Sequence, residues 1–279
     1  MERIKKAVEK ARARREAGGG AAATAPQTQA QERGFRPGIS VPVGVGPEFS
    51  YSTTPTVSVS RELLHENRVI VGSEDPGASA YKILRTQTLQ RMNDNKWNTL
   101  AVTSPNIAAG KTLTAINLAV SIAMEVTKTV LLIDADLRRP SVHRFFGLNP
   151  KKGLSDYLIE GGNIQELLIH PNLGRIVILP GGRPLQNSSE MLGSPRMAHL
   201  VEEVKERYPE RVVVFDLPPV LAVDDALAFS PYVDACLLVV EEGRTQQEEL
   251  TGAAELLQGT TNIVGTVLNK SRLPSQPYY

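Results

Sequence analysis

The sequence is poor in cysteine and aromatic residues and has no long hydrophobic run. Its 279 residues contain one cysteine, one tryptophan and 5% aromatic residues in total. A single cysteine excludes an internal disulfide and fits a reducing cytosol. Cys236 stands inside an apolar run, which predicts a buried, unreactive thiol. No apolar run approaches the roughly 18–20 residues that span a membrane, and no apolar segment follows the basic N-terminus as it does in a secretory signal. We therefore expect a cytoplasmic protein without a transmembrane segment.

Charge and metal-binding side chains also lack a dominant pattern. Lys and Arg number 31 and Asp and Glu 30, so the formal net charge is +1. This balance gives no general attraction to nucleic acid or membrane, and the sparse aromatic residues offer no stacking platform for bases. The four histidines are scattered without metal-ligand spacing, which argues against a zinc site. We expect no nucleic-acid partner.

The first 60 residues differ in composition from the rest. Residues 1–17 hold seven Lys or Arg and three Glu, a net charge of +4, with a thin apolar stripe at helical spacing. This predicts a short basic helix, which is either simply solvated or docks on anionic lipid or an acidic partner. Residues 18–60 are rich in Gly, Pro, Ser, Thr, Gln and Ala and predict a disordered linker. The folded domain should span 61–270, followed by a flexible tail, 271–279.

From residue 61 onward, short apolar runs alternate with helical patterns. The runs do not alternate polar and apolar residues, which is typical of parallel strands that are buried on both faces. The sequence therefore predicts an α/β fold, with a mostly parallel sheet covered by helices on both faces. The predicted strands are 100–102, 129–133, 175–179, 211–215, 236–240 and 263–268, with a strand or lead-in at 68–71. The longer predicted helices are 79–92, 111–126, 196–208 and 246–258, and the shorter ones are 153–160, 164–169 and 224–230.

Residues 99–119, TLAVTSPNIAAGKTLTAINLA, have the order of a phosphate-binding loop. An apolar strand leads into a loop of small and polar residues, and Gly110-Lys111-Thr112 opens a long helix. The N–H groups of such a loop and the helix dipole attract an anion. Lys111 would reach the outer phosphates, and the Thr112 hydroxyl would bind Mg²⁺. Pro105 replaces the first Gly of the pattern, and Ala108 costs about 1 kcal/mol or more if its position needs a positive φ.

Three aspartates directly follow predicted strands. Asp134 and Asp136 come after 129–133, and Asp216 comes after 211–215. Because ligands bind beyond the carboxyl ends of parallel strands, these carboxylates should converge with the phosphate-binding loop at one edge of the sheet. Mg²⁺ prefers oxygen ligands, so Asp136 and Asp216 would join Thr112 in holding the metal. Asp134 would share a face with Asp136 if the strand geometry continues, and would accept a proton from an incoming hydroxyl.

The motifs SPNIAAGKTLTAINLA, VLLIDADLRRP and VVVFDLPPVLAVDDA, in this order, resemble the Walker A, A′ and B motifs of bacterial tyrosine kinases. YKILRTQ, LPGGRPLQNSSEML and GTVLNKSR extend the resemblance from about residue 68 to the C-terminus. It implies a P-loop NTPase fold that binds ATP and Mg²⁺ and transfers the γ-phosphate to tyrosines of its own tail, here Tyr278 and Tyr279. The implied nucleotide-binding residues are Ala108, Ala109, Gly110, Lys111, Thr112 and Leu113, with Asn269 as a candidate reader of the adenine edge, and catalysis would involve Lys111, Asp134, Asp136 and Asp216.

The resemblance also implies partners. These cytoplasmic kinases are tied to exopolysaccharide chain-length control, and the detached helix and linker resemble the exosortase-linked branch, in which the kinase is separate from its membrane partner. We therefore expect a membrane-bound polysaccharide chain-length determinant, or co-polymerase, as activator, and a location at the inner face of the membrane through that protein. The family's oligomer motif, Glu-x-x-Arg-x-x-Arg, is represented here by Ser79, Lys82 and Arg85. A homo-oligomer would accordingly lack one ion pair between subunits.

Two other interpretations fit the same loop and carboxylates. One is a nucleotide-dependent ATPase switch of the partitioning and division-site type, which dimerises on ATP without phosphorylating a protein. That family carries an extra lysine early in the loop, and residues 103–106 contain none. The other is a degenerate kinase that binds ATP and only signals occupancy to its partner. The loop's departure from the family pattern, with Ile107-Ala108 in place of Pro-Gly, keeps this alternative open.

Overall fold

The computed structural model describes residues 54–206 and 210–271. The predicted helix 1–17, most of the predicted linker 18–60 and both tail tyrosines, Tyr278 and Tyr279, lie outside these residues. Residues 55–57 are bonded to the folded domain. The N–H of His170 donates to the Pro55 carbonyl (3.0 Å), and the N–H of Val57 donates to the His170 carbonyl (2.8 Å). Residues 55–57 therefore already contact the domain, a few residues before its predicted start at position 61.

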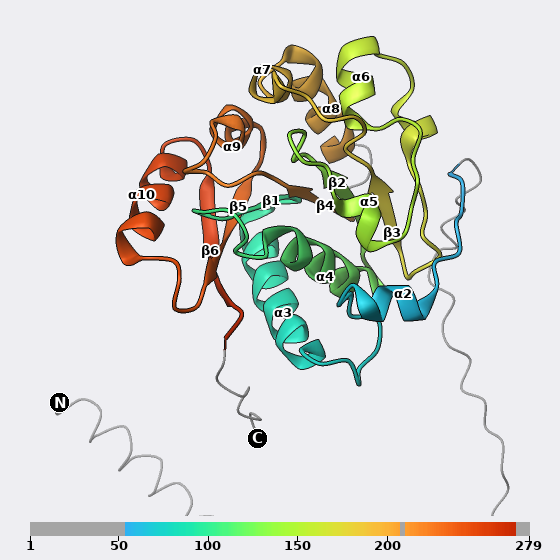
Figure 1. Cartoon of the computed structure of the whole chain (residues 1–279), viewed down its shortest axis with the longest axis horizontal. Coiled ribbons are helices and arrows are strands. Elements are labelled where there is room, and N and C mark those ends of the chain that lie inside the picture. Colours follow the sequence, from blue (N-terminus) through green and yellow to red (C-terminus); the bar gives the residue numbers. More distant parts are fainter. Residues whose placement is uncertain (1–53, 207–209, 272–279) are drawn as a thin grey trace, which may run out of the picture. The chain divides into compact units, whose positions relative to one another are not determined.

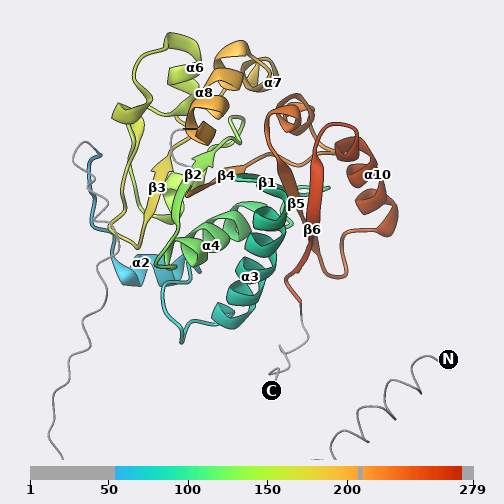
Figure 2. The same ribbon diagram turned by 180° about the vertical axis from the view of Figure 1, so that it is seen from behind.

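Six parallel strands form one sheet in the order β3-β2-β4-β1-β5-β6 (Figure 1). Figure 2 shows this order from behind, with β3 at one edge and β6 at the other. The predicted fold class is confirmed, and each strand lies within one residue of its predicted bounds. The strands are β1 (Thr99–Thr103), β2 (Thr129–Asp134), β3 (Ile176–Leu179), β4 (Arg211–Asp216), β5 (Ala235–Glu241) and β6 (Asn262–Asn269).

Side chains of each strand alternate between two hydrophobic cores, one on each face of the sheet. On β2, Val130 and Leu132 belong to the core under one group of helices, and Leu131 and Ile133 belong to the core under the other. Every residue of β1 and β2 is buried, which explains why these runs carry no polar alternation. The first group is α2 (Arg61–Glu66), α3 (Ala78–Asn95) and α4 (Lys111–Ala123), and the second is α6 (Leu154–Glu160), α8 (Pro195–Glu206), α9 (Asp225–Phe229) and α10 (Gln247–Gln258).

The register of the strands aligns the ends that carry the predicted site. Asp134, the last residue of β2, pairs with Asp216, the last residue of β4. Asp216 also pairs with Val102 of β1, one residue before that strand ends. The central strand β1 therefore delivers the phosphate-binding loop beside both carboxylates, at the point where the strand order reverses. Such a switch point is where open parallel sheets bind ligands.

Three short helices and one loop differ from the prediction. The helices α2, α5 (Val142–Phe145) and α7 (Ser188–Leu192) were not expected, and residues 68–71, predicted as a strand or a lead-in, form a loop. Arg68 has a φ of 59°, a left-handed conformation that no strand contains. The start of α5 is held by the carboxyl group of Asp134, seven residues before Ser141. This contact lies outside the helix, so the sequence of the helix itself did not predict it.

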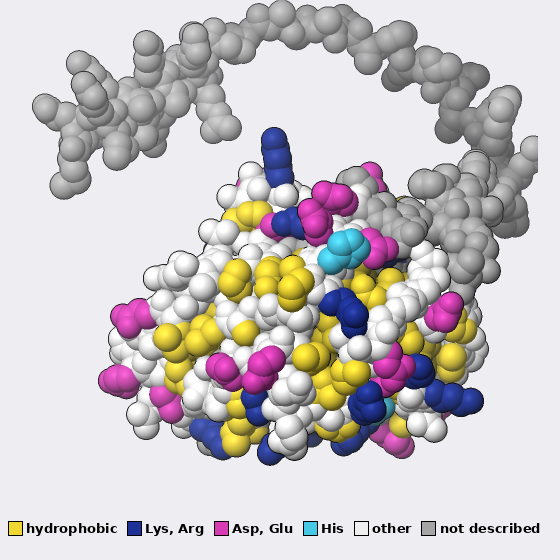
Figure 3. All heavy atoms as spheres, turned by 90° about the horizontal axis from the view of Figure 1, so that it is seen from above, with side chains coloured by type: hydrophobic (Ala, Val, Ile, Leu, Met, Phe, Trp, Pro, Cys, Tyr) yellow, Lys and Arg dark blue, Asp and Glu magenta, His cyan; other side chains and the backbone are white. Residues whose placement is uncertain are grey.

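The surface on the side of α6, α7, α8 and α9 is mixed. Figure 3 shows hydrophobic side chains in several small groups on this face, with acidic and basic side chains interspersed among them. None of the helices in residues 54–206 and 210–271 is both long and apolar enough to cross a membrane.

Candidate active site

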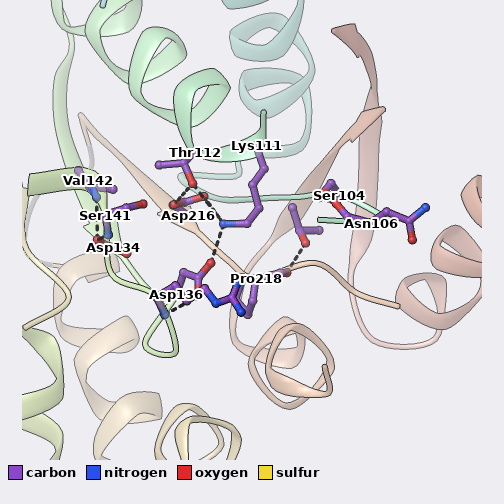
Figure 4. Close-up of polar contacts among 12 residues, drawn as sticks. Ser104, Asn106, Lys111, Thr112, Asp134, Asp136, Ser141, Val142, Asp216 and Pro218 are labelled. Carbon is purple, nitrogen blue, oxygen red and sulfur yellow. Dashed lines mark hydrogen bonds and ion pairs between the residues drawn. The ribbon is translucent and has the colours of Figure 1, made fainter. Parts of the chain in front are cut away.

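The loop between β1 and α4 has the strained shape expected of an anion cradle. Ala108 has a φ of 63° and Gly110 a φ of 91°, so two left-handed residues flank Ala109. Gly110 is the N-cap of α4, and its carbonyl accepts from the Thr114 N–H at 2.9 Å. Earlier in the loop, the Ser104 hydroxyl donates to the Asn106 carbonyl at 2.7 Å (Figure 4). The positive φ at position 108 is the case in which an alanine is unfavourable, by about 1–2 kcal/mol.

We expect Ala108→Gly to raise the free energy of unfolding by about 0.5–1 kcal/mol. Glycine removes the left-handed strain but restores part of the chain entropy that alanine had limited, so the net gain is smaller than the strain itself. Urea denaturation of the two proteins measures the difference. A less stable glycine variant would show that the loop does not hold this conformation in solution.

Lys111 lies between two of the predicted aspartates (Figure 4). Its ammonium nitrogen is 2.8 Å from Asp136 Oδ2 and 3.3 Å from Asp216 Oδ1. The Thr112 hydroxyl donates to Asp216 Oδ2 at 2.7 Å. The predicted loop residues and the two predicted metal ligands, 25 to 105 positions apart in sequence, therefore form one polar cluster.

Burial and charge act in opposite directions on this lysine. Asp216 is fully buried, and the side chains of Lys111 and Asp136 are 12% and 10% exposed. Burial alone would lower the pKa of Lys111, but the carboxylates of Asp216 and Asp136 outweigh it and raise the pKa. The lysine is therefore charged and offsets part of the negative charge of the two carboxylates.

Asp134 lies beside this cluster and is fully buried. Its Oδ2 accepts from the N–H groups of Ser141 (2.8 Å) and Val142 (2.9 Å), which start α5. Its Oδ1 has no hydrogen-bond partner within the described residues. Burial, reinforced by the charge of Asp216, raises the pKa of Asp134 to about 8, although the two N–H groups oppose the shift. The carboxyl group thus fixes the loop that carries Asp136 and keeps one oxygen unused.

The oxygen donors at this edge suit Mg²⁺ bound together with phosphates. Thr112, Asp136 and Asp216 supply a hydroxyl and two carboxylates, which are hard ligands. Within the described residues, no group of three or more His, Cys, Asp or Glu is arranged to hold a metal by itself. Mg²⁺ commonly takes one or two carboxylates from the protein and completes its shell with substrate phosphates and water. The residues present fit that mode of binding.

The remaining predicted nucleotide contacts also lie at this edge. Leu113 is in the first turn of α4. Asn269, the last residue of β6, uses its amide nitrogen to donate to the Ala109 carbonyl at 2.8 Å. Its predicted role as a reader of adenine stays a prediction, and the donor half of its amide is engaged by the loop.

One charged network beside the site was missed from the sequence. Arg138 Nε donates to Asp225 Oδ2 at 2.9 Å, and the Ser188 hydroxyl is hydrogen-bonded to the other oxygen of Asp225. Asp225 is fully buried at the start of α9. The network ties the loop after Asp136 to α7 and α9. No local spacing marks it, since its members come from segments far apart in the sequence.

Asp225→Ala is expected to lower the free energy of unfolding by about 3 kcal/mol, because it leaves Arg138 and Ser188 without their buried acceptor. Asp224→Ala is the matched control. The Asp224 side chain is 73% exposed and lies 3.7 Å from Arg138, so its loss should change stability by less than about 0.5 kcal/mol. Thermal denaturation followed by calorimetry compares the two. Equal effects would contradict a structural role of the buried network.

The residues that replace the family's oligomer motif lie on α3. Ser79 and Lys82 are exposed, and Arg85 pairs within the chain with Glu125 (2.9 Å) and donates to the Ser121 carbonyl (3.1 Å). The neighbouring Ile83 is 46% exposed. Arg85 thus fixes α3 to the end of α4, and a contact between subunits through this helix remains a prediction.

Comparisons with known proteins show which family this chain belongs to. Residues 99–271 match the AAA domain family. Tyrosine-protein kinase YwqD of Bacillus subtilis (strain 168) is 32% identical over 216 residues, which cover 76% of this chain and 90% of that protein. Tyrosine-protein kinase Etk of Escherichia coli (strain K12) is 34% identical over 196 residues, which cover 70% of this chain but 27% of that protein.

Solved structures show the same relation. The kinase domain of the Escherichia coli tyrosine kinase ETK superposes with a TM-score of 0.68 at 30% identity, covering 81% of this chain and 91% of that one. The cell division ATPase MinD of Pyrococcus furiosus, at 20% identity and a TM-score of 0.54 over 64% of this chain and 76% of that one, shares the fold alone. The chain therefore belongs to the family of bacterial tyrosine-protein kinases, enzymes that transfer phosphoryl groups to tyrosine.

Proposed function

We propose that this chain is an ATP-dependent autokinase that transfers the γ-phosphate of ATP to Tyr278 and Tyr279 of its own tail. The observation that carries the proposal is the cluster of Lys111, Thr112, Asp136 and Asp216 at the start of α4. A cation, a hydroxyl and two carboxylates at a helix N-terminus are the groups that hold a metal-bound triphosphate. Phosphoryl transfer needs little more than such placement and charge stabilisation.

Each residue has a separate part in this proposal. Lys111 leaves the carboxylates and binds the outer phosphates, whose charge replaces that of Asp136 and Asp216. Thr112, Asp136 and Asp216 would hold Mg²⁺, which neutralises charge on the transferred group. Asp134 is the proposed acceptor of the tyrosine proton through Oδ1, which has no hydrogen-bond partner within the described residues. It would act in its ionised form, a minority at neutral pH but a stronger base because its pKa is raised to about 8. The loop N–H groups orient the phosphates, and Asn269 is retained as a residue of the nucleotide site.

The proposed setting is exopolysaccharide biosynthesis or export. The chain matches 27% of Etk's length and 90% of YwqD's, and an activator is proposed from the resemblance to the family. We propose a membrane-bound polysaccharide chain-length determinant, or co-polymerase, as that activator, with the kinase held at the inner face of the membrane by it. In a homo-oligomer, one copy would then phosphorylate the tail tyrosines of another copy.

The test is to incubate the purified full chain with Mg-ATP and to map phosphate by mass spectrometry. Phosphotyrosine is expected at positions 278 and 279 and should disappear in the Tyr278→Phe/Tyr279→Phe variant. Tyr232→Phe is a matched control, because Tyr232 lies in the domain, where its hydroxyl donates to the Gly193 carbonyl. This variant should keep the tail phosphorylation.

The other outcomes identify the two alternatives. ATP hydrolysis without phosphotyrosine would indicate an ATPase switch of the partitioning type. ATP binding without hydrolysis or transfer would indicate a degenerate kinase that reports occupancy to its partner. Phosphotyrosine found only in the domain would support the kinase activity and contradict the proposal that the tail is its substrate.

A further inference from the structure

The end of β6 is hydrogen-bonded to the crest of the phosphate-binding loop. Asn269 Nδ2 donates to the Ala109 carbonyl at 2.8 Å, and Lys270 Nζ donates to the Ala108 carbonyl at 2.8 Å. Two consecutive loop carbonyls are therefore held by two consecutive residues from the opposite end of the domain's sequence. We call Asn269 and Lys270 the β6 clamp.

The clamp sets the direction of two amide groups. In a planar trans peptide, the carbonyl and the N–H point in opposite directions. The Ala108 carbonyl shares its peptide with the Ala109 N–H, and the Ala109 carbonyl shares its peptide with the Gly110 N–H. Holding both carbonyls toward β6 consequently turns both N–H groups away from β6, toward the inside of the loop. Neither N–H donates to an acceptor within the described residues, so both are available to phosphate oxygens.

The loop needs such support because it contains a strained residue. Ala108 is left-handed, with a φ of 63°, in a conformation that disfavours side chains other than glycine. Lys270 binds the carbonyl of that same residue. Its ammonium is fixed in turn by Glu241 Oε2, 3.0 Å away at the end of β5. The lysine therefore connects the strained position to the neighbouring strand.

Close packing confirms that the loop and the clamp fit tightly. A Cβ atom built on Gly110 would lie 2.1 Å from Asn269 Nδ2. A side chain at position 110 would thus displace Asn269 from the loop carbonyl. The glycine before Lys111 is required here by this contact as well as by its own φ of 91°.

We propose that Asn269 and Lys270 are positioning residues that hold the phosphate-binding loop in its anion-binding shape. They orient the N–H groups of Ala109 and Gly110, and Lys270 offsets the absence of glycine at position 108. The inference rests on the proposed nucleotide site and adds a role for Lys270. It also gives Asn269 a task that involves the phosphates rather than the base.

Binding of MgADP and of magnesium pyrophosphate, measured by titration calorimetry on the full chain, tests the clamp. Lys270→Met and Asn269→Leu should each weaken both ligands by the same factor, about tenfold, as expected for loss of one hydrogen bond that orders the loop. Arg244→Met is the matched control. It removes a cation 3.6 Å from the same Glu241 oxygen without touching the loop, and should change either affinity by less than about twofold.

Two comparisons can overturn the proposal. If Asn269→Leu weakens MgADP but not pyrophosphate, Asn269 reads the base and the clamp is wrong. In an Ala108→Gly background, Lys270→Met should cost less than in the wild type, because glycine removes the strain; an equal cost in both backgrounds would overturn the support of Ala108.

Hydrogen exchange separates this inference from the proposed function. In the ligand-free protein, the Thr114 amide, which donates to the Gly110 carbonyl at 2.9 Å, should exchange faster in both clamp variants than in the wild type. Its exchange should be unchanged in Arg244→Met. Unchanged exchange in the clamp variants overturns the clamp even if the wild type binds nucleotide well. A wild type that binds no MgADP contradicts the proposed function instead, whatever the exchange rates show.

Discussion

Lys111→Met is expected to reduce tail phosphorylation by about 10³-fold or more, the largest loss of any single change. This ammonium is held by Asp136 at 2.8 Å and Asp216 at 3.3 Å, so it lies at the edge where the phosphates would bind. Methionine keeps the length of the side chain and removes its charge. Initial rates of phosphotyrosine formation with saturating Mg-ATP measure the effect.

The same substitution should also destabilise the free protein. Without the lysine, the buried Asp216 loses the ammonium 3.3 Å away and keeps the neighbouring carboxyl groups of Asp136 and Asp134. Uptake of a proton limits the cost to about 2 kcal/mol. Lys111→Arg is the control, since it keeps a cation between the carboxylates but changes the geometry that the phosphates require. We expect this variant to have nearly the wild-type melting temperature and little activity. An active Lys111→Met protein would remove Lys111 from the mechanism.

The elements that were predicted from the sequence depend on local patterns. Apolar runs without alternation mark strands buried on both faces, and each run in β1 and β2 is fully buried. Once the strands are parallel, residues that follow them share one edge, and the strand order β2-β4-β1 brings Asp136 and Asp216 beside Lys111. The proximity of these side chains was therefore predictable, whereas their roles toward a nucleotide stay predictions.

The features that were not predicted depend on contacts between distant segments. The helix α5 is stabilised by the Asp134 carboxyl group, and Asp225 finds Arg138 across 87 positions. The engagement of Asn269 with the Ala109 carbonyl spans 160 positions. Its position beyond the last strand suggested a ligand contact, but only the register of β5 and β6 places its amide against the loop. Sequence spacing carries no signal for such pairs.

Asp216→Asn should reduce the rate of phosphorylation by about 10²–10³-fold while leaving the fold intact. The carboxylate accepts from Thr112 at 2.7 Å and faces Lys111 at 3.3 Å. An amide must turn its oxygen toward the lysine, because an ammonium only donates. Its NH₂ group then faces Thr112 and donates to the hydroxyl oxygen, which is the atom proposed to bind Mg²⁺. The variant thus loses one negative charge, and its amide also occupies the Thr112 hydroxyl oxygen, the second proposed Mg²⁺ ligand.

Stability should respond differently from activity in this variant. The Lys111 ammonium contacts two carboxylates, Asp136 and Asp216, and burial raises the pKa of Asp216. Removing this buried negative charge should therefore change the free energy of unfolding by less than about 1 kcal/mol. The Mg²⁺ concentration for half-maximal activity should rise, since two of the proposed ligands are impaired. Asp224→Asn, at a side chain that is 73% exposed, should leave both quantities unchanged. A Mg²⁺ requirement that does not move in Asp216→Asn would exclude Asp216 as a ligand, and with it the placement of the metal between β4 and α4.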